Sequence, residues 1–325
     1  MSLILAIPSK GRLKEQVEDW LADAGLPVRL IGGERGYAAR LDGLDDIQVR
    51  LLSASDIAEA LWSGDVHLGV TGEDLLRERG EGLADRVELM APLGFGRADL
   101  VVAAPKSWID VETMADIDEV AHLYLARTGR RLRVATKYLT QTRAFFARHH
   151  IADYRIVESA GATEGAPAAG AAELVVDITT TGATLEANQL KVLGDGVILK
   201  SQAQLAASLA ADWGRERLPV VHRLMGVLEG RARARSLTSL VWPAEQDAAA
   251  KAATAPFLAR GAQARTNGLL TPTAAVFGVS AALAAAGVGP VTATQPSYVF
   301  EAVSPSARRL QERIQATDSK TRPAF

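Results

Sequence analysis

The sequence predicts an α/β protein in which two lobes enclose a cleft and a small α+β domain follows. Over the first two thirds of the chain, short β-rich runs alternate with amphipathic helical segments, which is the pattern of α/β proteins. Gly94 and Gly96 separate two strand-like runs, as expected where a chain crosses from one lobe to another. After Trp213 the pattern changes to a long helix followed by alanine-rich segments.

The first lobe is expected to comprise residues 1–97 together with residues 191–215. Strand-like runs cover residues 3–7, 47–52, 67–70 and 87–95, and helical patterns cover residues 12–24, 55–63 and 73–79. The second lobe is expected over residues 98–190, with strands at 99–104, 132–136, 154–157 and 174–177 and helices at 139–149, 164–172 and from Gly182. The run at 191–199 is expected to be a strand that returns to the first lobe.

A linking helix is predicted over residues 216–235, because apolar side chains form one stripe along it. Residues 236–325 are expected to form the C-terminal domain. Whether this domain is regulatory is left open. Its convincing strands number only three, at residues 237–242, 263–270 and 291–303, with helices at 244–259 and 272–286 between them.

The amino-acid composition excludes several kinds of partner and metal site. The 325 residues are 48% hydrophobic, enough for two or three packed units, and a net charge of -2 without basic blocks argues against nucleic acid as a partner. Zero cysteines exclude disulfides and thiolate metal sites, and the five histidines lack ligand spacing, so we expect any metal to arrive with a substrate. No export signal or bilayer-spanning run is visible, which predicts a cytoplasmic protein without a membrane partner.

A hydroxyl-rich loop follows the buried strand at 174–177. Asp177 precedes a run of three threonines, and Gly182, Ala183 and Thr184 then open a helix. Hydroxyls and free N–H groups at such a point favour a bound phosphate, and a carboxylate at the strand end suits sugar hydroxyls. Together they fit a ribose 5-phosphate, although an ordinary strand–turn–helix with a threonine cap remains the alternative.

Charged residues stand at other strand ends. Lys10, Gly11 and Arg12 open the first helix, where the two cations would suit a polyphosphate or form a solvated helix start. Glu73 and Asp74 could hold a hydroxyl or a hydrated Mg²⁺, or simply complement the helix dipole.

Three further residues remain candidates of the same kind. Glu158 and Glu164 flank a glycine-containing turn, where we favour a substrate contact over simple capping. Arg97 follows Gly94 and Gly96 as an isolated cation. Taken alone, it is more safely interpreted as a solvent-facing charge, and the same holds for Lys137 after the strand at 132–136.

Taken together, these residues resemble the ATP phosphoribosyltransferase family, whose enzymes catalyse the first step of histidine biosynthesis. The family signature is filled at every fixed position, by Glu164, Gly170, Ala172, Val175, Asp177, Ile178, Thr181, Gly182, Thr184 and Leu185. The likeness extends over about residues 1–210.

The resemblance implies two periplasmic-binding-protein-like lobes and a reaction in which N1 of ATP displaces pyrophosphate from phosphoribosyl pyrophosphate, with Mg²⁺ as the cofactor. It implies phosphate binding by Thr179, Thr180, Thr181, Gly182, Ala183 and Thr184, and catalytic roles for Asp177, Glu164 and Lys10. Contacts to ATP or pyrophosphate fall to Lys10, Gly11, Arg12, Arg97, Glu73 and Glu158.

The sequence departs from the family pattern at two places. Ser53 stands where many members carry an arginine, so another cation is needed there, either Arg50 or one from a neighbouring subunit. Long members end in a regulatory domain that binds histidine and has the order strand-helix-strand-strand-helix-strand, which three strands do not satisfy. Feedback by histidine therefore stays open, as does the number of subunits in the expected homo-oligomer. A non-catalytic binding protein of the same fold is the rival hypothesis, and a regulatory paralogue without activity is a third.

Overall fold

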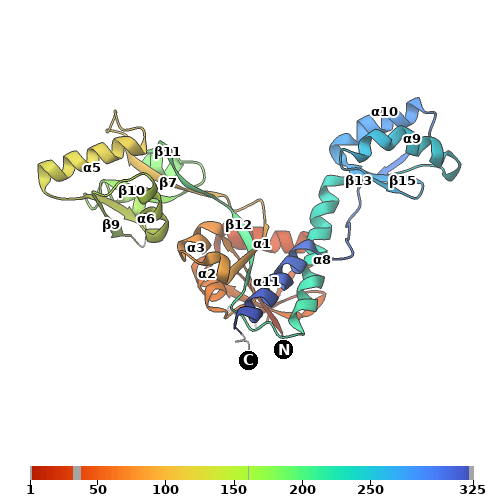
Figure 1. Ribbon diagram of the computed structural model, residues 1–325, viewed down its shortest axis with the longest axis horizontal. Helices are drawn as coiled ribbons and strands as arrows, with labels where there is room; N and C mark the ends of the chain where they lie inside the picture. The colour runs from red at the N-terminus through yellow and green to blue at the C-terminus, as the bar shows by residue number, and fades with distance from the viewer. Residues whose placement is uncertain (1, 32–37, 160, 322–325) are drawn as a thin grey trace.

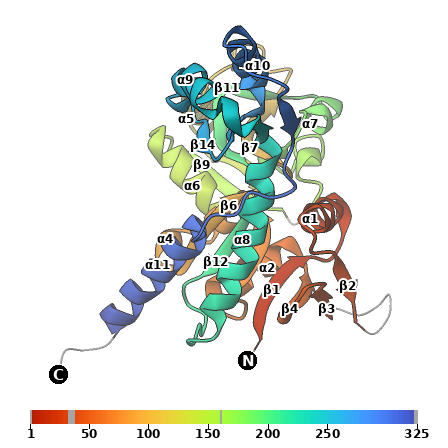
Figure 2. The same ribbon diagram turned by 90° about the vertical axis from the view of Figure 1, so that its right-hand side faces the viewer.

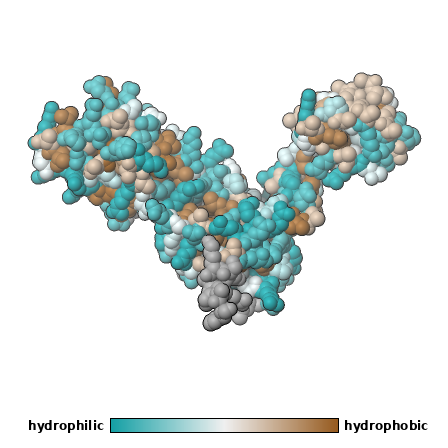
Figure 3. Space-filling model, viewed as in Figure 1, coloured by the Kyte–Doolittle hydropathy of each residue, from teal (hydrophilic) through white to brown (hydrophobic). Residues whose placement is uncertain are grey.

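The computed structural model describes residues 2–31, 38–159 and 161–321. They form a V-shaped outline, with lobe I at the vertex, lobe II on one arm and the C-terminal domain on the other (Figures 1 and 3). The predicted fold class, α/β with two lobes and a small C-terminal α+β domain, is confirmed. No helix in these three ranges is both long and apolar enough to cross a bilayer.

Lobe I is built on a sheet whose described strands lie in the order β2-β3-β4-β1-β5-β12-β6. The strands are β1 (Leu3–Pro8), β2 (Val28–Leu30), β3 (Ala38–Leu41), β4 (Leu44–Leu52), β5 (Leu68–Gly72), β6 (Val87–Pro92) and β12 (Ala203–Ser208). The helices are α1 (Gly11–Asp23), α2 (Ala54–Ser63), α3 (Glu73–Glu78) and α4 (Leu83–Arg86). β1 pairs in parallel with β4 and β5, and β12 runs antiparallel beside β5.

Helices cover both faces of this sheet, which explains why β1 is apolar along its whole length. Leu5 and Ile7 belong to the same hydrophobic cluster as Val17 of α1. Ala6, on the opposite face, packs in a second cluster with Ile57 of α2. The central strand therefore lies between two cores, and its carboxyl end opens onto the start of α1.

Lobe II contains a second sheet, in the order β11-β7-β10-β8-β9 over the described residues. Its elements are β7 (Ala98–Pro105), α5 (Met114–Thr128), β8 (Leu132–Thr136), α6 (Leu139–Arg148), β9 (Tyr154–Glu158), η1 (Thr163–Gly165), β10 (Leu174–Thr179), α7 (Ala183–Ala187) and β11 (Leu190–Ser201). β8, β9 and β10 are parallel, whereas β7 and β11 run antiparallel to their neighbours.

Two expectations for lobe II need correction. β11 pairs with β7 as far as Ser201, so residues 191–201 belong to the sheet of lobe II and the return to lobe I comes later than residue 191. The helix expected at 164–172 is only the 3₁₀ turn η1, followed by further turns. Glycines at 165 and 170 weaken any helix there, and Gly170 has a positive φ of 66°.

The C-terminal domain begins after α8 (Arg217–Ser236) and has the order strand-helix-strand-strand-helix-strand in its described part. Its elements are β13 (Leu237–Val241), η2 (Ala244–Gln246), α9 (Asp247–Leu258), β14 (Gln263–Arg265), β15 (Gly268–Pro272), η3 (Thr273–Ala275), α10 (Val276–Ala285) and β16 (Thr292–Thr294). The antiparallel sheet order is β14-β15-β13-β16. The expectation of three strands is therefore wrong, because the run at 263–270 is a hairpin of two strands.

The chain does not end in this domain. The strand expected at 291–303 stops at Thr294, and the chain then runs back along α8 to form α11 (Pro305–Thr321) on lobe I (Figures 1 and 2). Ala307, Leu310 and Ile314 of α11 are buried in the core of lobe I. Arg309 of the same helix pairs with Glu88 of β6 at 2.7 Å, so α11 covers the edge strand of the sheet.

Candidate functional site

The carboxyl ends of the parallel strands in lobe II meet at one edge. Val176 is level with Thr136 in the β10–β8 ladder, and Thr136 is level with Glu158 in the β8–β9 ladder. The residues that follow, Asp177 on β10 and Lys137 after β8, therefore lie at the same edge. This is the position at which open α/β sheets bind ligands.

Asp177 lies at the centre of this edge and is half-buried. Burial raises the pKa of its carboxyl group, and the neighbouring charge of Glu164 acts in the same direction. The amide of Ile178 donates to Asp177 Oδ1 at 2.8 Å, and this bond and the charge of Lys137 oppose the rise in pKa. The charges of Lys137 and Glu164 therefore act on the pKa of Asp177 in opposite directions.

The threonine loop follows Asp177 and is ordered by its own side chains. Thr179 Oγ1 accepts from the amide of Gly182 at 2.9 Å, and Thr181 Oγ1 accepts from the amide of Ala183 at 3.4 Å. Gly182 has a φ of 78°, in the left-handed region that only glycine adopts at little cost. Two amides expected to face an anion are therefore bonded within the loop, while Thr180, Thr181 and Thr184 are exposed.

A cavity of about 420 Å³ lies against this loop, and two basic side chains line it. Its lining includes Thr179 and Thr180 of the loop, the cations Arg97 and Lys200, and one acidic residue, Asp99. The hydroxyl of Thr180 donates to the backbone carbonyl of Arg97 at 3.3 Å, which joins the loop to the chain that crosses between the lobes. The structure therefore brings Arg97 to the threonine loop and adds Lys200 beside it.

Lobe I presents its own cations at the carboxyl end of β1. Lys10, Gly11 and Arg12 are exposed, and neither cation makes an ion pair with any residue that the structure describes. α1 and α7, which begin at the two clusters, lie on the same side of the molecule (Figure 2). The cavity at the threonine loop reaches Arg97 but includes neither Lys10 nor Arg12.

The two expected glutamate contacts differ in their surroundings. Glu158 is exposed at the end of β9, and its carboxylate has no bonding partner within the described ranges. Glu164 lies in η1, close enough to influence Asp177. In the same turn, Thr163 is buried and donates to Ser159 Oγ at 3.2 Å.

Glu73 and Asp74 are both hydrogen-bonded, Glu73 to side chains within lobe I and Asp74 also to lobe II. Glu73 accepts from Arg77 Nε at 2.7 Å and from Gln204 Nε2 at 2.8 Å. Asp74 is buried and bonds to Tyr138 and Ser201. Both carboxylates are already partnered, so the structure does not bring Glu73 to the edge of lobe II as an open ligand.

The replacement at Ser53 has a local explanation. Ser53 caps α2, and its Oγ accepts from the amide of Asp56 at 3.1 Å. Arg50 donates to the carbonyl of Asp65, which precedes β5 and lies at the opposite edge of the sheet. Arg50 thus has a backbone partner just before β5, and its role as the cation that compensates for Ser53 stays a prediction.

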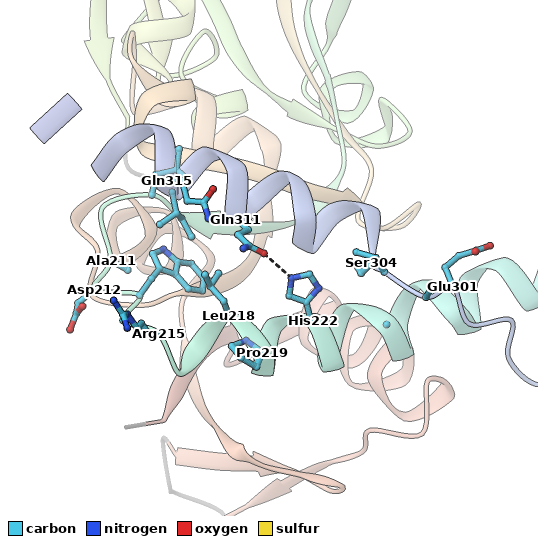
Figure 4. A pocket seen from close by; sticks show the side chains of 17 residues that line it. Ala211, Asp212, Arg215, Leu218, Pro219, His222, Glu301, Ser304, Gln311 and Gln315 are labelled. Atoms are coloured by element: carbon cyan, nitrogen blue, oxygen red, sulfur yellow. Dashed lines mark hydrogen bonds between the residues drawn. The ribbon is translucent and has the colours of Figure 1, made fainter. Parts of the chain in front are cut away.

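Two further features bear on cofactors and ligands. Within the ranges that the model covers, no three His, Cys, Asp or Glu side chains are grouped to hold a metal ion. A larger cavity, of about 990 Å³, lies between α8 and α11, where His222 and Gln311 are 3.3 Å apart (Figure 4). It belongs to the outer face of lobe I and is lined by none of the candidate residues.

Comparisons with known proteins identify the family of this chain. A family model described as ATP phosphoribosyltransferase (HisG) matches residues 53–229. A protein of Caulobacter vibrioides named ATP phosphoribosyltransferase is 67% identical over 314 residues, covering 97% of this chain and 98% of that protein. A protein of the same name from Rhodopseudomonas palustris is 48% identical over 315 residues, covering 95% of this chain and 97% of that protein.

Among solved structures, the ATP phosphoribosyl transferase (HisG:HisZ) complex from Thermotoga maritima is similar, with a TM-score of 0.54 and 26% identity. The match covers 70% of this chain and 96% of that chain. The signature at the threonine loop, the extent of the family match and the full-length identity lead to one conclusion. The chain belongs to the ATP phosphoribosyltransferase family.

Proposed function

We propose that this chain joins ATP to phosphoribosyl pyrophosphate at the carboxyl edge of lobe II, with the cations of lobe I completing the site. The reaction transfers the phosphoribosyl group to N1 of ATP, releases pyrophosphate and is the first step of histidine biosynthesis. The observation that carries the assignment of the site is the threonine loop, directly after Asp177 and beside a cavity that contains Arg97 and Lys200.

In this proposal the loop binds the 5-phosphate of the sugar. Thr179 and Thr181 hold the loop in shape through bonds to its own amides. The exposed hydroxyl of Thr184 bonds to no residue that the structure describes and can donate to a phosphate oxygen, whereas Thr180 would have to exchange its bond to the carbonyl of Arg97 to do so. The start of α7 also leaves amides without a helical acceptor. A loop that is shaped before the ligand arrives loses little entropy on binding.

Asp177 is proposed to hold the ribose hydroxyls and to stabilise positive charge on the sugar. N1 of adenine carries no proton, so the reaction needs no strong general base. The transition state instead combines a cationic sugar with a departing polyanion, for which fixed charges are effective. A half-buried carboxylate with Lys137 and Glu164 beside it provides such a charge, and Glu164 would help to orient the ribose.

The polyanions are proposed to bind between the lobes. Arg97 and Lys200 would face pyrophosphate, while Lys10, Gly11 and Arg12 would face it or the triphosphate of ATP from lobe I. Glu158, whose carboxylate is unpaired among the described residues, would accept from a nucleotide hydroxyl.

The donors at this edge are compatible with Mg²⁺ that arrives with the substrates. Mg²⁺ keeps most of its waters and takes one or two carboxylates, which Asp177 and Glu164 can supply. When bound, the ion would neutralise charge on the departing pyrophosphate.

The test combines the three components and follows the ultraviolet absorbance of the nucleotide product. We expect a rise in absorbance that needs the protein, ATP, phosphoribosyl pyrophosphate and Mg²⁺ together. Thr181→Ala should raise the KM for phosphoribosyl pyrophosphate, and Lys200→Ala should weaken inhibition by added pyrophosphate. Binding of the sugar phosphate without any rise in absorbance would favour a sensor of the same fold.

The proposal includes histidine as a feedback inhibitor that binds the C-terminal domain. Its support is the element order of that domain, which matches the order expected for long family members. Hydrogen exchange on the full chain, with and without histidine, tests it. Protection is expected in β13, β15 and β16, and protection confined to the threonine loop would contradict it.

We also propose that the chain is a cytoplasmic homo-oligomer. The C-terminal domain exposes large apolar side chains, among them Phe277 at 90% and Val241 at 52%. Figure 3 shows weakly hydrophobic side chains over the outer end of this domain. Light scattering should report a multimer for the wild type and a smaller species for Phe277→Asp.

A further inference from the structure

A buried polar network joins the two lobes on one side of the cleft. The hydroxyl of Tyr138, from lobe II, donates to Asp74 Oδ2 of lobe I at 2.7 Å. Ser201, where the chain leaves lobe II, donates from Oγ to Asp74 Oδ1 at 2.8 Å and accepts from the amide of Asp74 at 3.0 Å. We call Asp74, Tyr138 and Ser201 the interlobe latch.

The latch is shielded from water. The exposed fractions are 5% for Asp74, 1% for Tyr138 and 3% for Ser201. Burial raises the pKa of Tyr138, and the charge of Asp74 adds to the rise, so the hydroxyl stays protonated and remains the donor. In such an environment the loss of one partner leaves a buried polar group without a bond.

Further hydrogen bonds beside the latch also join the two lobes. α3 of lobe I meets the start of α6 in lobe II, where Glu78 accepts from the amides of Thr140 and Gln141 at 2.7 and 3.2 Å. Gln141 Nε2 in turn donates to the carbonyl of Asp74 at 2.9 Å. These contacts fix α3 against lobe II, and Figure 1 shows α3 on the side of lobe I that faces lobe II.

The latch also reaches the proposed site. Tyr138 directly follows Lys137, and the ammonium group of Lys137 lies 5.1 Å from the centre of the Tyr138 ring. Lys137 is the cation that acts on Asp177. The side chain of Tyr138 therefore bonds to Asp74 of lobe I through its hydroxyl and contacts, through its ring, a cation beside the proposed sugar-binding carboxylate.

We propose that Asp74 and Tyr138 are positioning residues, which set the angle between the lobes so that the cations of lobe I face the threonine loop of lobe II. This inference rests on the proposed function, because the reaction needs groups from both lobes at once. Most of the groups proposed to bind phosphoribosyl pyrophosphate, namely the threonine loop, Asp177, Arg97 and Lys200, lie on the lobe II side. The latch therefore acts mainly on turnover and much less on binding of that substrate.

Three substitutions separate positioning from simple stability. Tyr138→Phe removes only the hydroxyl, and we expect kcat to fall about 10- to 100-fold, as for a misplacement near 1 Å, while the KM for phosphoribosyl pyrophosphate stays close to wild type. Asp74→Asn can still accept from Tyr138 and bond to Ser201, so it should retain most of the wild-type kcat. Asp74→Ala can do neither and should be the slowest.

Tyr124→Phe is the matched control. Its hydroxyl also donates to a carboxylate, that of Glu173 at 3.1 Å, but at the other end of lobe II. Tyr124 is half-buried and Glu173 keeps its bonds to Arg133, so we expect a smaller loss of thermal stability and no change in kcat. If Tyr124→Phe and Tyr138→Phe lower kcat equally, the latch acts only through stability and the proposal is overturned.

A distance measurement tests the latch without using activity. The chain has no native cysteine, so spin labels can be placed at Asp19→Cys on α1 and Glu119→Cys on α5, both exposed. We expect one narrow interlobe distance in the parent and in Tyr124→Phe, and a broad or shifted one in Tyr138→Phe. An unchanged distribution in Tyr138→Phe would refute the latch. A broadened distribution in a protein whose parent has no transferase activity would support the latch and reject the proposed function.

Discussion

Gly182→Ala gives the sharpest test of the threonine loop, because the structure separates its two possible effects. Gly182 has a φ of 78°, and a Cβ added there would meet nothing within 4 Å. The alanine methyl group therefore fits, and the only penalty is conformational. A non-glycine residue in the left-handed region costs about 1–2 kcal/mol.

The loop is exposed on both sides of Gly182, so a substituted loop can relax without disturbing the core. The ligand must then restore the shape in which Thr179 bonds to the amide of residue 182. If the whole penalty appears in binding, affinity for phosphoribosyl pyrophosphate falls about 5- to 30-fold, since about 1.4 kcal/mol is a factor of ten. Asparagine tolerates positive φ better, so Gly182→Asn should lose less.

Isothermal titration of phosphoribosyl pyrophosphate into each variant measures this loss. Gly129→Ala is the control, because Gly129 ends α5 with a φ of 65° and an added Cβ would also meet nothing within 4 Å. It carries a similar penalty far from the proposed site, so its affinity should equal that of the wild type. Wild-type affinity in Gly182→Ala, or an equal loss in both variants, would refute the reasoning.

Three further predictions concern charge and packing. Burial raises the pKa of Asp177, so ionisation of its carboxyl group lowers the stability of the fold as the pH rises through that pKa. Asp177→Asn should therefore melt at a higher temperature than the wild type at neutral pH. The same variant should have a lower kcat, and its rate should no longer fall on the acid side of the pH profile. An Asn variant that is less stable at neutral pH would contradict this. Burial lowers the pKa of His67, whose Nδ1 accepts from the amide of Ile4 at 3.1 Å, so the neutral ring stabilises the fold above about pH 6.5 and that contribution is lost as the pH falls through the lowered pKa. His67→Gln should flatten the dependence of the melting temperature on pH in this range, and an identical acid loss in both proteins would count against the assignment. Leu310 of α11 is fully buried, so Leu310→Ala should lower the free energy of unfolding by about 2–5 kcal/mol in urea titrations, whereas Gln315→Ala, an exposed change on the same helix, should have little effect.

The threonine loop could be found from the sequence because its parts are contiguous. Asp177, the three threonines and Gly182 lie within one strand–loop–helix unit, so local chemistry alone suggests a phosphate site. Lys200 gave no such signal. It reaches the loop because β11 pairs with β7 antiparallel, placing Lys200 level with Asp99, and that register follows from tertiary folding. Lys137, considered only as a solvent-facing charge, acquires its role from the neighbouring strand.

Acidic residues at a helix start were harder to interpret. Glu73 and Asp74 have the same sequence context whether they bind a ligand, complement a dipole or join two lobes, and the partners that decide the matter are distant in the chain.

The C-terminal errors have different physical causes. β14 and β16 fall inside runs that the sequence predicts to be strands, but each is three residues long and exposed throughout. Without alternation of buried and exposed residues, neither the turn before Gly268 nor the end of β16 at Thr294 could be located. α11, by contrast, left a readable signal that the sequence analysis missed. Pro305 opens the helix, and Ala307, Leu310 and Ile314 follow at helical spacing on its buried face.

Because α11 packs on lobe I, the C-terminal domain is inserted between two helices of lobe I, α8 and α11. The polypeptide enters the domain through α8 and leaves it beside the same helix. The amide of Val299, in the segment that leaves the domain, donates to the carbonyl of Gly230 in α8 at 2.9 Å. The two connecting segments are therefore hydrogen-bonded to each other. Rotation of the domain relative to lobe I must therefore strain both connecting segments, which end in helices α8 and α11 packed on lobe I, the lobe in which Lys10 follows β1. A stop codon near Arg235 would also strip a helix from the core, and clean removal of the insertion requires splicing α8 to α11 instead.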